Sequence, residues 1–379
     1  MNQAFKRGLL AAVSTLALAT SAQAAEIKIG VAEALSGGAA QYGIAIRNGF
    51  QLAAEEINAA GGIQGNTLQL VIEDEQGKKE EAINVFKKLI FQDKVLMVFG
   101  PTLSNSAQAA HPVAQAAKTV AFGTSNTADG ITSIGNYVFR NSVTEADVLP
   151  ETIKTAVRLA GVKKVAVLYG NDDVFTKSGY DNFKKALADL NIPVTTTETF
   201  AKGDVDFKAQ LTKIKASQPD AIVLSALIAE GAPIMVQARQ IGINLPVIGG
   251  NGMNSTKIFD LAKGASDNLY VGSPWAASND TPENTRFIKA YTAKYKMAPD
   301  QFAAQAYDAL YIASQALRKV TLSGNLSQDR AALQAALPTV SWKGATGDFQ
   351  FRQFKNKGYD AQQKPLVSIT KGHAVVIEK

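Results

Sequence analysis

The sequence contains no cysteine among its 379 residues and only two histidines, His111 and His373. The absence of cysteine excludes disulfide bonds, thiolate zinc sites, iron–sulfur clusters and a cysteine nucleophile. With only two histidines, a multi-histidine metal site or a histidine relay is not expected. The sequence also lacks a GxxxxGK phosphate loop, a GxSxG nucleophile motif and an HExxH helix. These absences predict a protein that is not an enzyme and that carries no cofactor and no metal.

Charged residues make up 19% of the chain and hydrophobic residues 46%, a balance typical of globular proteins. Lys and Arg (39) exceed Asp and Glu (33), but the basic residues are scattered and are not interleaved with aromatic residues. This distribution argues against nucleic acid as a partner. The length exceeds what one typical core absorbs and predicts two lobes.

Residues 1–24 have the three parts of a secretory signal peptide. Lys6 and Arg7 precede an apolar run from Leu9 to Ala19, and the small residues of Ala22-Gln23-Ala24 surround a cleavage point. The alternative is an N-terminal anchor helix, for which the apolar run is short. No later apolar run reaches about 18 residues, and no cysteine could carry a lipid. We therefore predict an exported periplasmic protein without direct membrane insertion.

Short apolar strands alternate with helical segments along the rest of the chain. This rhythm is typical of parallel sheets that are covered by helices on both faces. Two successive series of alternating strands and helices occur, the second beginning after Arg140. They predict an α/β protein with two doubly wound lobes. The expected strands are residues 27–32, 68–72, 95–99, 120–122, 165–169, 194–199, 221–224 and 247–248, followed by closing strands at 349–351, 367–369 and 374–377.

Two polar loops follow strands of the first series. The strand at 95–99 runs into residues 100–106, where Ser104 begins a helix, and the strand at 120–122 runs into residues 123–127. Ligands of open α/β sheets bind beyond the carboxyl ends of the strands, and a helix N-terminus favours anions. Ser104 could instead serve only as a helix N-cap. The two loops together favour a site for a small carboxylate.

Several motifs resemble the type I periplasmic binding proteins, in the branched-chain amino-acid receptor group of ABC importers. The resemblance covers the chain after the signal peptide. It rests on Leu35-Ser36-Gly37, Ala40-Gln41-Tyr42-Gly43, Ala53-Ala54-Glu55-Glu56-Ile57-Asn58, Gly61-Gly62-Ile63, Gly65, Gly100-Pro101, Ala238-Arg239-Gln240-Ile241-Gly242 and Ala306-Tyr307-Asp308-Ala309.

The resemblance implies two lobes joined by three crossings, with the ligand in the cleft between them. It places residues 25–142 and 275–355 in the N-terminal lobe, and residues 143–274 and 356–379 in the C-terminal lobe. The crossings are expected near residues 141–144, 273–275 and 354–364.

The resemblance also implies roles for residues of the N-terminal lobe. Ser104 and Thr127 match a serine and a threonine that clamp an α-carboxylate, and the carbonyl of Ser125 matches an acceptor for an ammonium group. Tyr42 matches an aromatic residue on the first loop. Tyr307 matches a tyrosine near the pocket, with buried packing as the alternative.

On the C-terminal lobe, Phe175 and Leu227 stand where relatives often carry tyrosines, and Asn251 stands where they carry an acid facing the ammonium. A buried ammonium requires an opposite charge or good acceptors. The neutral side chain of Asn251 therefore favours a carboxylate without an ammonium, such as an aromatic or aliphatic acid. An amino acid remains the alternative.

The function that follows is capture of a small carboxylate by lobe closure and its delivery to the permease of an ABC importer. We expect a monomer. A sensor that reports the ligand to a receptor is an alternative of another class, and a hydrolase would lack its nucleophile and base.

Overall fold

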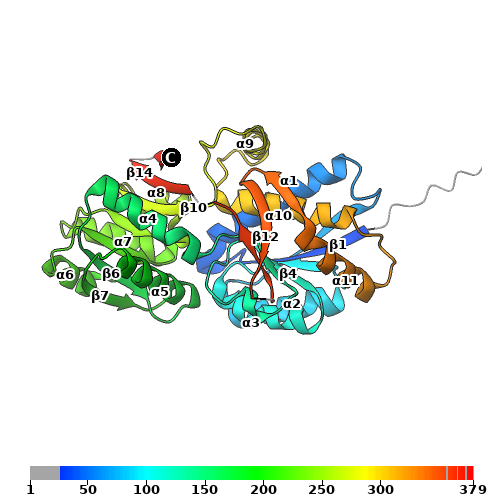
Figure 1. The fold of residues 1–379 in the computed structure, drawn as a ribbon, viewed down its shortest axis with the longest axis horizontal. Helices are drawn as coiled ribbons and strands as arrows, with labels where there is room; N and C mark the ends of the chain where they lie inside the picture. The colour runs from blue at the N-terminus through cyan, green and yellow to red at the C-terminus, as the bar shows by residue number, and fades with distance from the viewer. Residues whose placement is uncertain (1–25, 356, 365, 372–373, 379) are drawn as a thin grey trace, which may run out of the picture.

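The computed structural model describes residues 26–355, 357–364, 366–371 and 374–378. The predicted signal peptide and His373 lie outside the described residues. The described chain forms two α/β lobes side by side (Figure 1), so the predicted fold class is confirmed. Among the described residues, no helix combines the length and the apolar character needed to cross a bilayer.

The N-terminal lobe is built on an eight-stranded sheet with the order β11-β12-β13-β5-β4-β3-β1-β2. The run from β13 to β2 is parallel, whereas β11, β12 and β13 pair antiparallel. The carboxyl ends of the parallel strands face the other lobe. The strands are β1 (Glu26–Glu33), β2 (Thr67–Asp74), β3 (Met97–Phe99), β4 (Val120–Gly123), β5 (Val138–Arg140), β11 (Ser341–Gly344), β12 (Gly347–Gln353) and β13 (Tyr359–Gln362).

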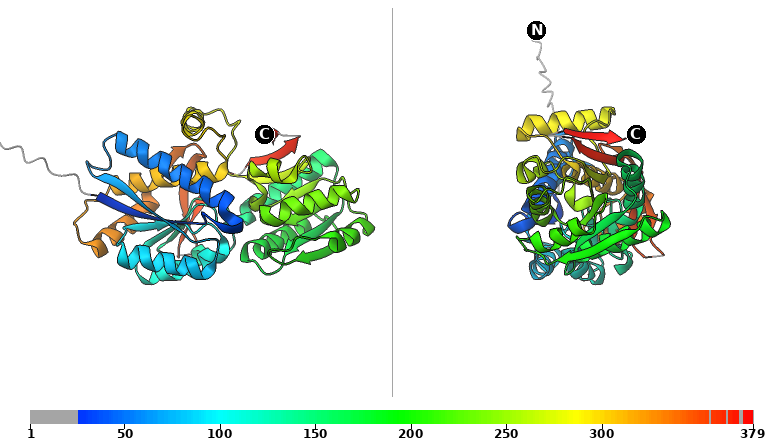
Figure 2. Two further views of the ribbon diagram at one scale, coloured as in Figure 1. Left: turned by 180° about the vertical axis from the view of Figure 1, so that it is seen from behind. Right: turned by 90° about the vertical axis from the view of Figure 1, so that its left-hand side faces the viewer.

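Helices cover both faces of this sheet (Figure 2). The long helices α1 and α10 pack closely against each other, which requires a glycine at position 49, because a Cβ there would lie 2.2 Å from the carbonyl oxygen of Ala303. The helices of the lobe are α1 (Ala40–Ala59), α2 (Lys79–Lys87), α3 (Ser104–Ala116), α9 (Pro282–Tyr295), α10 (Gln301–Arg318) and α11 (Leu326–Ala336).

The C-terminal lobe has a seven-stranded sheet with the order β15-β14-β10-β9-β8-β6-β7. The elements of this lobe are α4 (Glu145–Ala160), β6 (Val165–Gly170), α5 (Val174–Asp189), β7 (Val194–Phe200), α6 (Lys208–Ala216), β8 (Ala221–Ser225), α7 (Ile228–Gln240), β9 (Val247–Gly249), α8 (Lys257–Ala262), β10 (Leu269–Ser273), β14 (Leu366–Lys371) and β15 (Ala374–Glu378).

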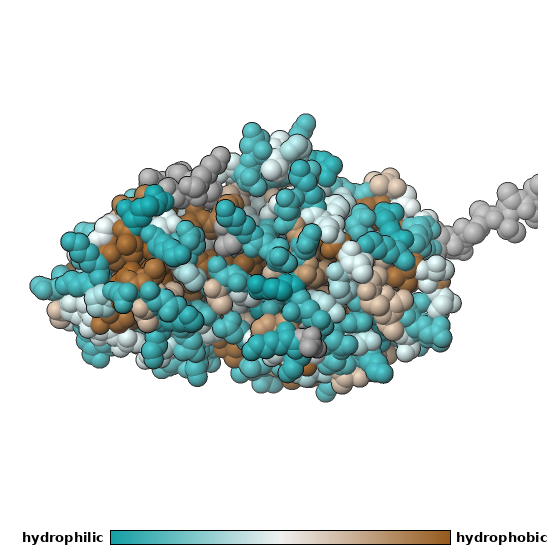
Figure 3. All heavy atoms as spheres, viewed as in Figure 1, coloured by the Kyte–Doolittle hydropathy of each residue, from teal (hydrophilic) through white to brown (hydrophobic). Residues whose placement is uncertain are grey.

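Hydrophilic side chains cover most of the molecular surface that faces the viewer in Figure 3, and hydrophobic side chains gather beside α4.

The chain crosses between the two sheets after β5, after β10 and after β13. The third crossing differs from the expected division at residues 355 and 356. Strand β13 pairs with β12 and β5 in the first sheet, so residues 359–362 belong to the N-terminal lobe and not to the C-terminal lobe. The crossing runs from the end of β13 to the start of β14. The short strand β5, which supplies this pairing, was not expected from the sequence.

Candidate functional site

Direct hydrogen bonds hold the two lobes together in a closed arrangement. The phenol of Tyr42 on α1 donates to the carbonyl of Gly252 (2.6 Å) and accepts from the N–H of Ile228 (2.8 Å). Asn105 on α3 donates to the carboxylate of Asp173 (2.5 Å) through its side-chain amide. Both contacts join the N-terminal lobe to loops at the carboxyl ends of strands in the C-terminal lobe.

A cavity lies where the loops of the two lobes meet. The cavity is narrow: the centre of a water-sized sphere can reach only about 20 Å³ of it, within about 340 Å³ of space free of protein atoms that includes open solvent. Both lobes contribute polar and apolar side chains to its lining. The lining residues are Tyr42, Thr102, Leu103, Ser104, Ser125, Asp173, Phe175, Leu227, Asn251, Gly252 and Phe302.

The two loops expected from the sequence meet at one side of this cavity. Ser104 is the first residue of α3, where backbone N–H groups have no acceptor within the helix. Its hydroxyl accepts a hydrogen bond from the N–H of Ala128 (3.3 Å), which ties the two loops together. The hydroxyl of Ser125 donates to the carbonyl of Thr102 (2.6 Å), so this side chain shapes the loops. The site combines a helix N-terminus with nearby hydroxyl and carbonyl groups.

On the C-terminal lobe, Phe175 and Leu227 stand at the starts of α5 and α7 and line the cavity. Asp173 caps α5 by accepting hydrogen bonds from the N–H groups of Phe175 and Thr176. Asn251 directs its side-chain amide toward the carbonyl of Ser125 (3.5 Å). These residues place two apolar side chains, one carboxylate and one neutral amide opposite the polar loops.

Comparison with known proteins gives the family of this chain. A family profile described as "Periplasmic binding protein" matches residues 26–371. The chain belongs to the periplasmic binding protein family. The two-lobed fold and the interlobe cavity of this periplasmic binding protein agree with that membership.

Two relatives show how close the similarity is. The Leucine-, isoleucine-, valine-, threonine-, and alanine-binding protein of Pseudomonas aeruginosa is 29% identical over 345 residues, which cover 90% of each chain. The crystal structure of the branched-chain amino acid transporter substrate binding protein LivJ from Streptococcus pneumoniae in complex with isoleucine is 30% identical, has a TM-score of 0.85, and is matched over 93% of this chain and 99% of that one.

A third solved structure shares the fold at lower identity. It is a solute binding protein of R. palustris in complex with benzoate, 23% identical, with a TM-score of 0.83 over 93% of this chain and 95% of that chain. At that identity, the likeness of the periplasmic binding protein to this neighbour shows the fold alone.

Five lining residues of this periplasmic binding protein were not expected from the sequence, namely Thr102, Leu103, Asp173, Gly252 and Phe302, and neither was Glu145 beside the cavity. The side chain of Glu145 is buried beside the cavity, and one oxygen, Oε1, accepts from the N–H of Asn251 (2.9 Å) and the hydroxyl of Thr127 (3.4 Å). The other oxygen, Oε2, has no hydrogen-bond partner among the residues that the structure describes. Burial raises the pKa of this carboxyl to about 7. In the sequence it resembles any acidic residue in the first turn of a helix, which is a common surface pattern.

Of the eight expected site residues, six line the cavity. Thr127 does not line it: its hydroxyl points to Glu145 at the cavity edge. Tyr307 lies elsewhere, because its phenol donates to Glu56 (2.5 Å) and its ring packs on Phe287 at 4.8 Å. The geometry therefore does not support a ligand contact for Tyr307, and the alternative, buried packing, describes its position. The six lining residues are Tyr42, Ser104, Ser125, Phe175, Leu227 and Asn251.

Two further acidic residues lie behind the cavity wall. Glu33 and Glu75 are fully buried, and the hydroxyl of Thr102, which lines the cavity, donates to Glu33 (2.5 Å). Burial raises the pKa of Glu33 well above its usual value and that of Glu75 to about 7. Among the described residues, no group of three or more His, Asp or Glu side chains is arranged to hold a metal ion.

Proposed function

We propose that this protein captures a small α-amino acid with an apolar side chain in the periplasm and delivers it, unchanged, to the membrane permease of an ABC importer. The observation that carries the proposal is the cavity at the lobe interface, which combines anion-binding groups, a buried carboxylate beside it and apolar walls. The two amino-acid-binding relatives, which are 29% and 30% identical to this chain, support an amino acid as the ligand.

The carboxylate of the ligand binds at the polar loops. Ser104 offers its hydroxyl and its backbone N–H at the start of α3, where the helix dipole favours a negative charge. The hydroxyl accepts from Ala128 and so retains its own proton as a donor. Hydrogen bonds of this type to an ionised group are about twice as strong as neutral ones.

The ammonium of the ligand binds between the carbonyl of Ser125 and the carboxylate of Glu145. Asn251 carries no charge. The carboxylate of Asp173, which lines the cavity, already accepts hydrogen bonds from Asn105 and from two N–H groups of α5. We therefore assign to Glu145 the opposite charge that a buried ammonium requires. The unpartnered Oε2 of Glu145 supports this role, because a buried carboxylate oxygen without a partner is costly. An ammonium beside Glu145 completes this set of contacts.

The apolar side chain of the ligand packs against Phe175, Leu227 and Phe302. Contacts from both lobes stabilise the closed arrangement, so binding and closure are coupled. The permease then distinguishes the closed form, loaded with ligand, from the open one.

A carboxylate without an ammonium is the second candidate ligand. The side-chain amide of Asn251 points at the carbonyl of Ser125 and occupies an acceptor that an ammonium would use. A benzoate-like or aliphatic acid would leave this contact in place. The neutral form of Glu145 would suit such a ligand.

A thermal-shift comparison of four molecules separates the candidates. L-Leucine, its 2-hydroxy analogue, leucine amide and benzoate differ in the ammonium, the carboxylate and the side chain. A ligand at 100 times its Kd adds about 2.7 kcal/mol to the free energy of unfolding. We expect a shift with L-leucine or another apolar amino acid and none with leucine amide. Shifts with benzoate or the 2-hydroxy acid and none with any amino acid would overturn the amino-acid assignment.

A further inference from the structure

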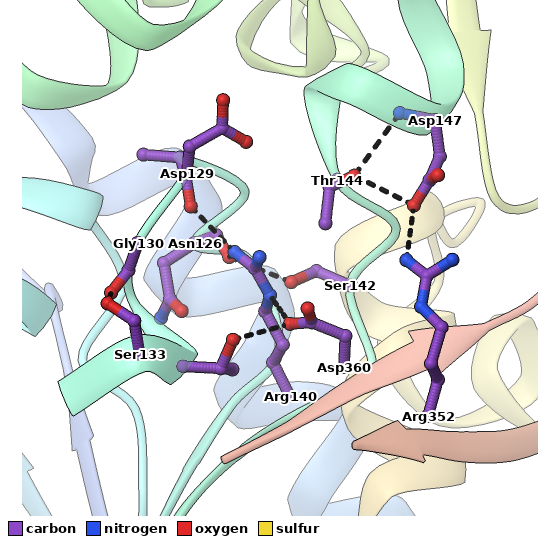
Figure 4. Close-up of polar contacts among 12 residues, drawn as sticks. Asn126, Asp129, Gly130, Ser133, Arg140, Ser142, Thr144, Asp147, Arg352 and Asp360 are labelled. Atoms are coloured by element: carbon purple, nitrogen blue, oxygen red, sulfur yellow. Dashed lines mark hydrogen bonds and ion pairs between the residues drawn. The ribbon is translucent and has the colours of Figure 1, made fainter. Parts of the chain in front are cut away.

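A buried arginine organises the backbone of the loop that carries Ser125 and Thr127. Arg140, the last residue of β5, is only 2% exposed. Its Nη1 donates to the carbonyls of Ala128 (2.8 Å) and Asn126 (3.2 Å). Those two carbonyls flank Thr127, and Figure 4 shows the guanidinium beside this loop. The arginine thus fixes the backbone on both sides of an expected ligand residue.

The same guanidinium is fixed from the opposite side by Asp360 on β13. The Nε of Arg140 lies 2.6 Å from Oδ1 of Asp360, and both side chains are buried. The hydroxyl of Thr132 donates to the same oxygen (2.9 Å), and that of Ser142 donates to the carbonyl of Asn126 (2.9 Å). Every one of these groups lies in the N-terminal lobe or at its boundary, so the network does not depend on lobe closure.

The ion pair also lies where the chain leaves the N-terminal lobe. Arg140 directly precedes the first crossing, and Asp360 lies two residues before the end of β13, which precedes the third. The pair therefore joins two of the three crossing segments to each other and to residues 126–128 of the ligand loop. A buried ion pair is seldom a large source of stability, which makes a positioning role the better account of it.

We propose that Arg140 and Asp360 are positioning residues that hold the 124–128 loop in its ligand-binding conformation before the ligand arrives. Neither residue lines the cavity. Their effect on affinity comes from a preorganised backbone, because ordering a loop on binding reduces the net affinity. The proposal rests on the proposed function only for the choice of ligand probe.

Arg140→Lys keeps the charge but removes the planar group that reaches Asp360 and both carbonyls. We expect the amides of residues 124–128 to exchange with deuterium about tenfold faster in the ligand-free variant, and L-leucine to bind about tenfold more weakly. Arg330→Lys is the matched control, because Arg330 is a buried arginine of the same lobe that donates to the carbonyls of Val95 and Ile90. It should leave loop exchange and affinity unchanged.

A double variant distinguishes a positioning role of the Arg140–Asp360 pair from a contribution of the pair to the stability of the fold. Arg140→Met combined with Asp360→Leu removes both charges and leaves neither one buried alone, so the melting temperature should recover relative to Arg140→Lys. Loop exchange should stay fast and affinity low, because the carbonyls of Asn126 and Ala128 still lack their donor.

Recovery of slow exchange together with stability would overturn the proposal, as would equal loop exchange in the Arg140→Lys and Arg330→Lys proteins. The exchange measurement needs no ligand. If the unmodified protein does not bind L-leucine, the proposed ligand is wrong, and the exchange data still decide the role of the ion pair.

Discussion

The phenol oxygen of Tyr42 accepts a hydrogen bond from the backbone N–H of Ile228, at 2.8 Å across the cleft. Ile228 begins α7 of the C-terminal lobe, so this N–H has no acceptor within its own helix. The phenol oxygen of Tyr42 therefore gives the N–H of Ile228 an acceptor that is within reach only when the lobes are closed. Because Tyr42 also lines the cavity, one side chain links the proposed ligand site to the contact between the lobes.

Tyr42→Phe should weaken ligand binding by about 1–3 kcal/mol, because the closed form loses the contacts to Ile228 and Gly252 and leaves both groups buried without a partner. Calorimetric titration measures the loss, and small-angle scattering should show less compaction on adding ligand. Tyr291→Phe is the control, because Tyr291 is a buried tyrosine whose hydroxyl contacts Asn48 within one lobe. Equal affinities for the Tyr42→Phe and unmodified proteins would refute a role in closure.

Ser104→Ala should weaken binding by about 1.5–3 kcal/mol, since it removes a hydroxyl that donates to a charged carboxylate in a desolvated cleft. The control is Ser314→Ala, which removes a buried hydroxyl bonded to the carbonyl of Tyr311 within α10. The two variants should melt similarly and differ in affinity. If calorimetry shows both binding as tightly as the unmodified protein, Ser104 does not contact the ligand.

The sign of the pH dependence distinguishes the two ligand classes. Burial raises the pKa of Glu145 from 4.5 to about 7. A ligand with an ammonium favours the ionised carboxylate, so binding releases a proton and affinity should rise from about pH 6 to about pH 8. A ligand without an ammonium favours the neutral carboxyl, so its affinity should fall over the same range.

Glu145→Gln should remove most of this dependence in either case, and should weaken an amino acid more than a simple acid. Calorimetry in buffers with different ionisation enthalpies measures the protons released. An amino acid whose affinity changes with pH equally in the Glu145→Gln and unmodified proteins would show that another group is responsible.

The ligand-free protein should lose stability as the pH rises from about 4.5 to about 7. Because the pKa of Glu145 is higher in the folded chain than its ordinary value of 4.5, the folded state binds more protons between about pH 4.5 and pH 7. The free energy of unfolding therefore falls across this window, as measured by denaturant titration. Glu75 and Asp300, whose pKa values burial raises to about 7 and about 6, act in the same direction. Glu145→Gln should reduce the slope without abolishing it.

Asn251→Glu tests whether the uncharged side chain at position 251 determines which ligand class binds. A second carboxylate near Glu145 should weaken a ligand without an ammonium by about 1–3 kcal/mol, through repulsion and desolvation. An amino acid should gain affinity or keep it. If Asn251 only shapes the turn at residues 249–252, the substitution would alter the melting temperature and leave the ratio of the two affinities unchanged.

The main features of the fold could be predicted because its parallel strands are short and uninterrupted in their hydrophobicity, as in β3 and β8. Strand β13 could not be predicted to lie in the first sheet. Its residues, Tyr359–Gln362, mix polar and apolar side chains, and its place depends on pairing with β5, more than 200 residues earlier in the chain. Local patterns carry no information about such a distant partner, which is why the third crossing was expected too early.

Some residues of the candidate site could likewise be predicted from the sequence, and others could not. Ser104 and Ser125 follow strands whose order was predictable, so their shared edge of the sheet followed from topology. The position of Glu145 depends on the course of the first crossing, and that of Tyr307 on which face of α10 packs against α1 and α9. Both faces of α10 are largely buried, so the sequence gives no contrast by which to choose the side that Tyr307 occupies.

The return of β13 to the first sheet has a consequence for the order of events during synthesis. The N-terminal lobe is complete only after Asp360 has been added, although most of its parallel sheet is already present by Arg140. Until then the guanidinium of Arg140 has no counter-charge in its buried position, and β5 has an open edge. A nascent chain that stops short of residue 360 should therefore remain incompletely folded, because this lobe can close its sheet only after Asp360 has been added.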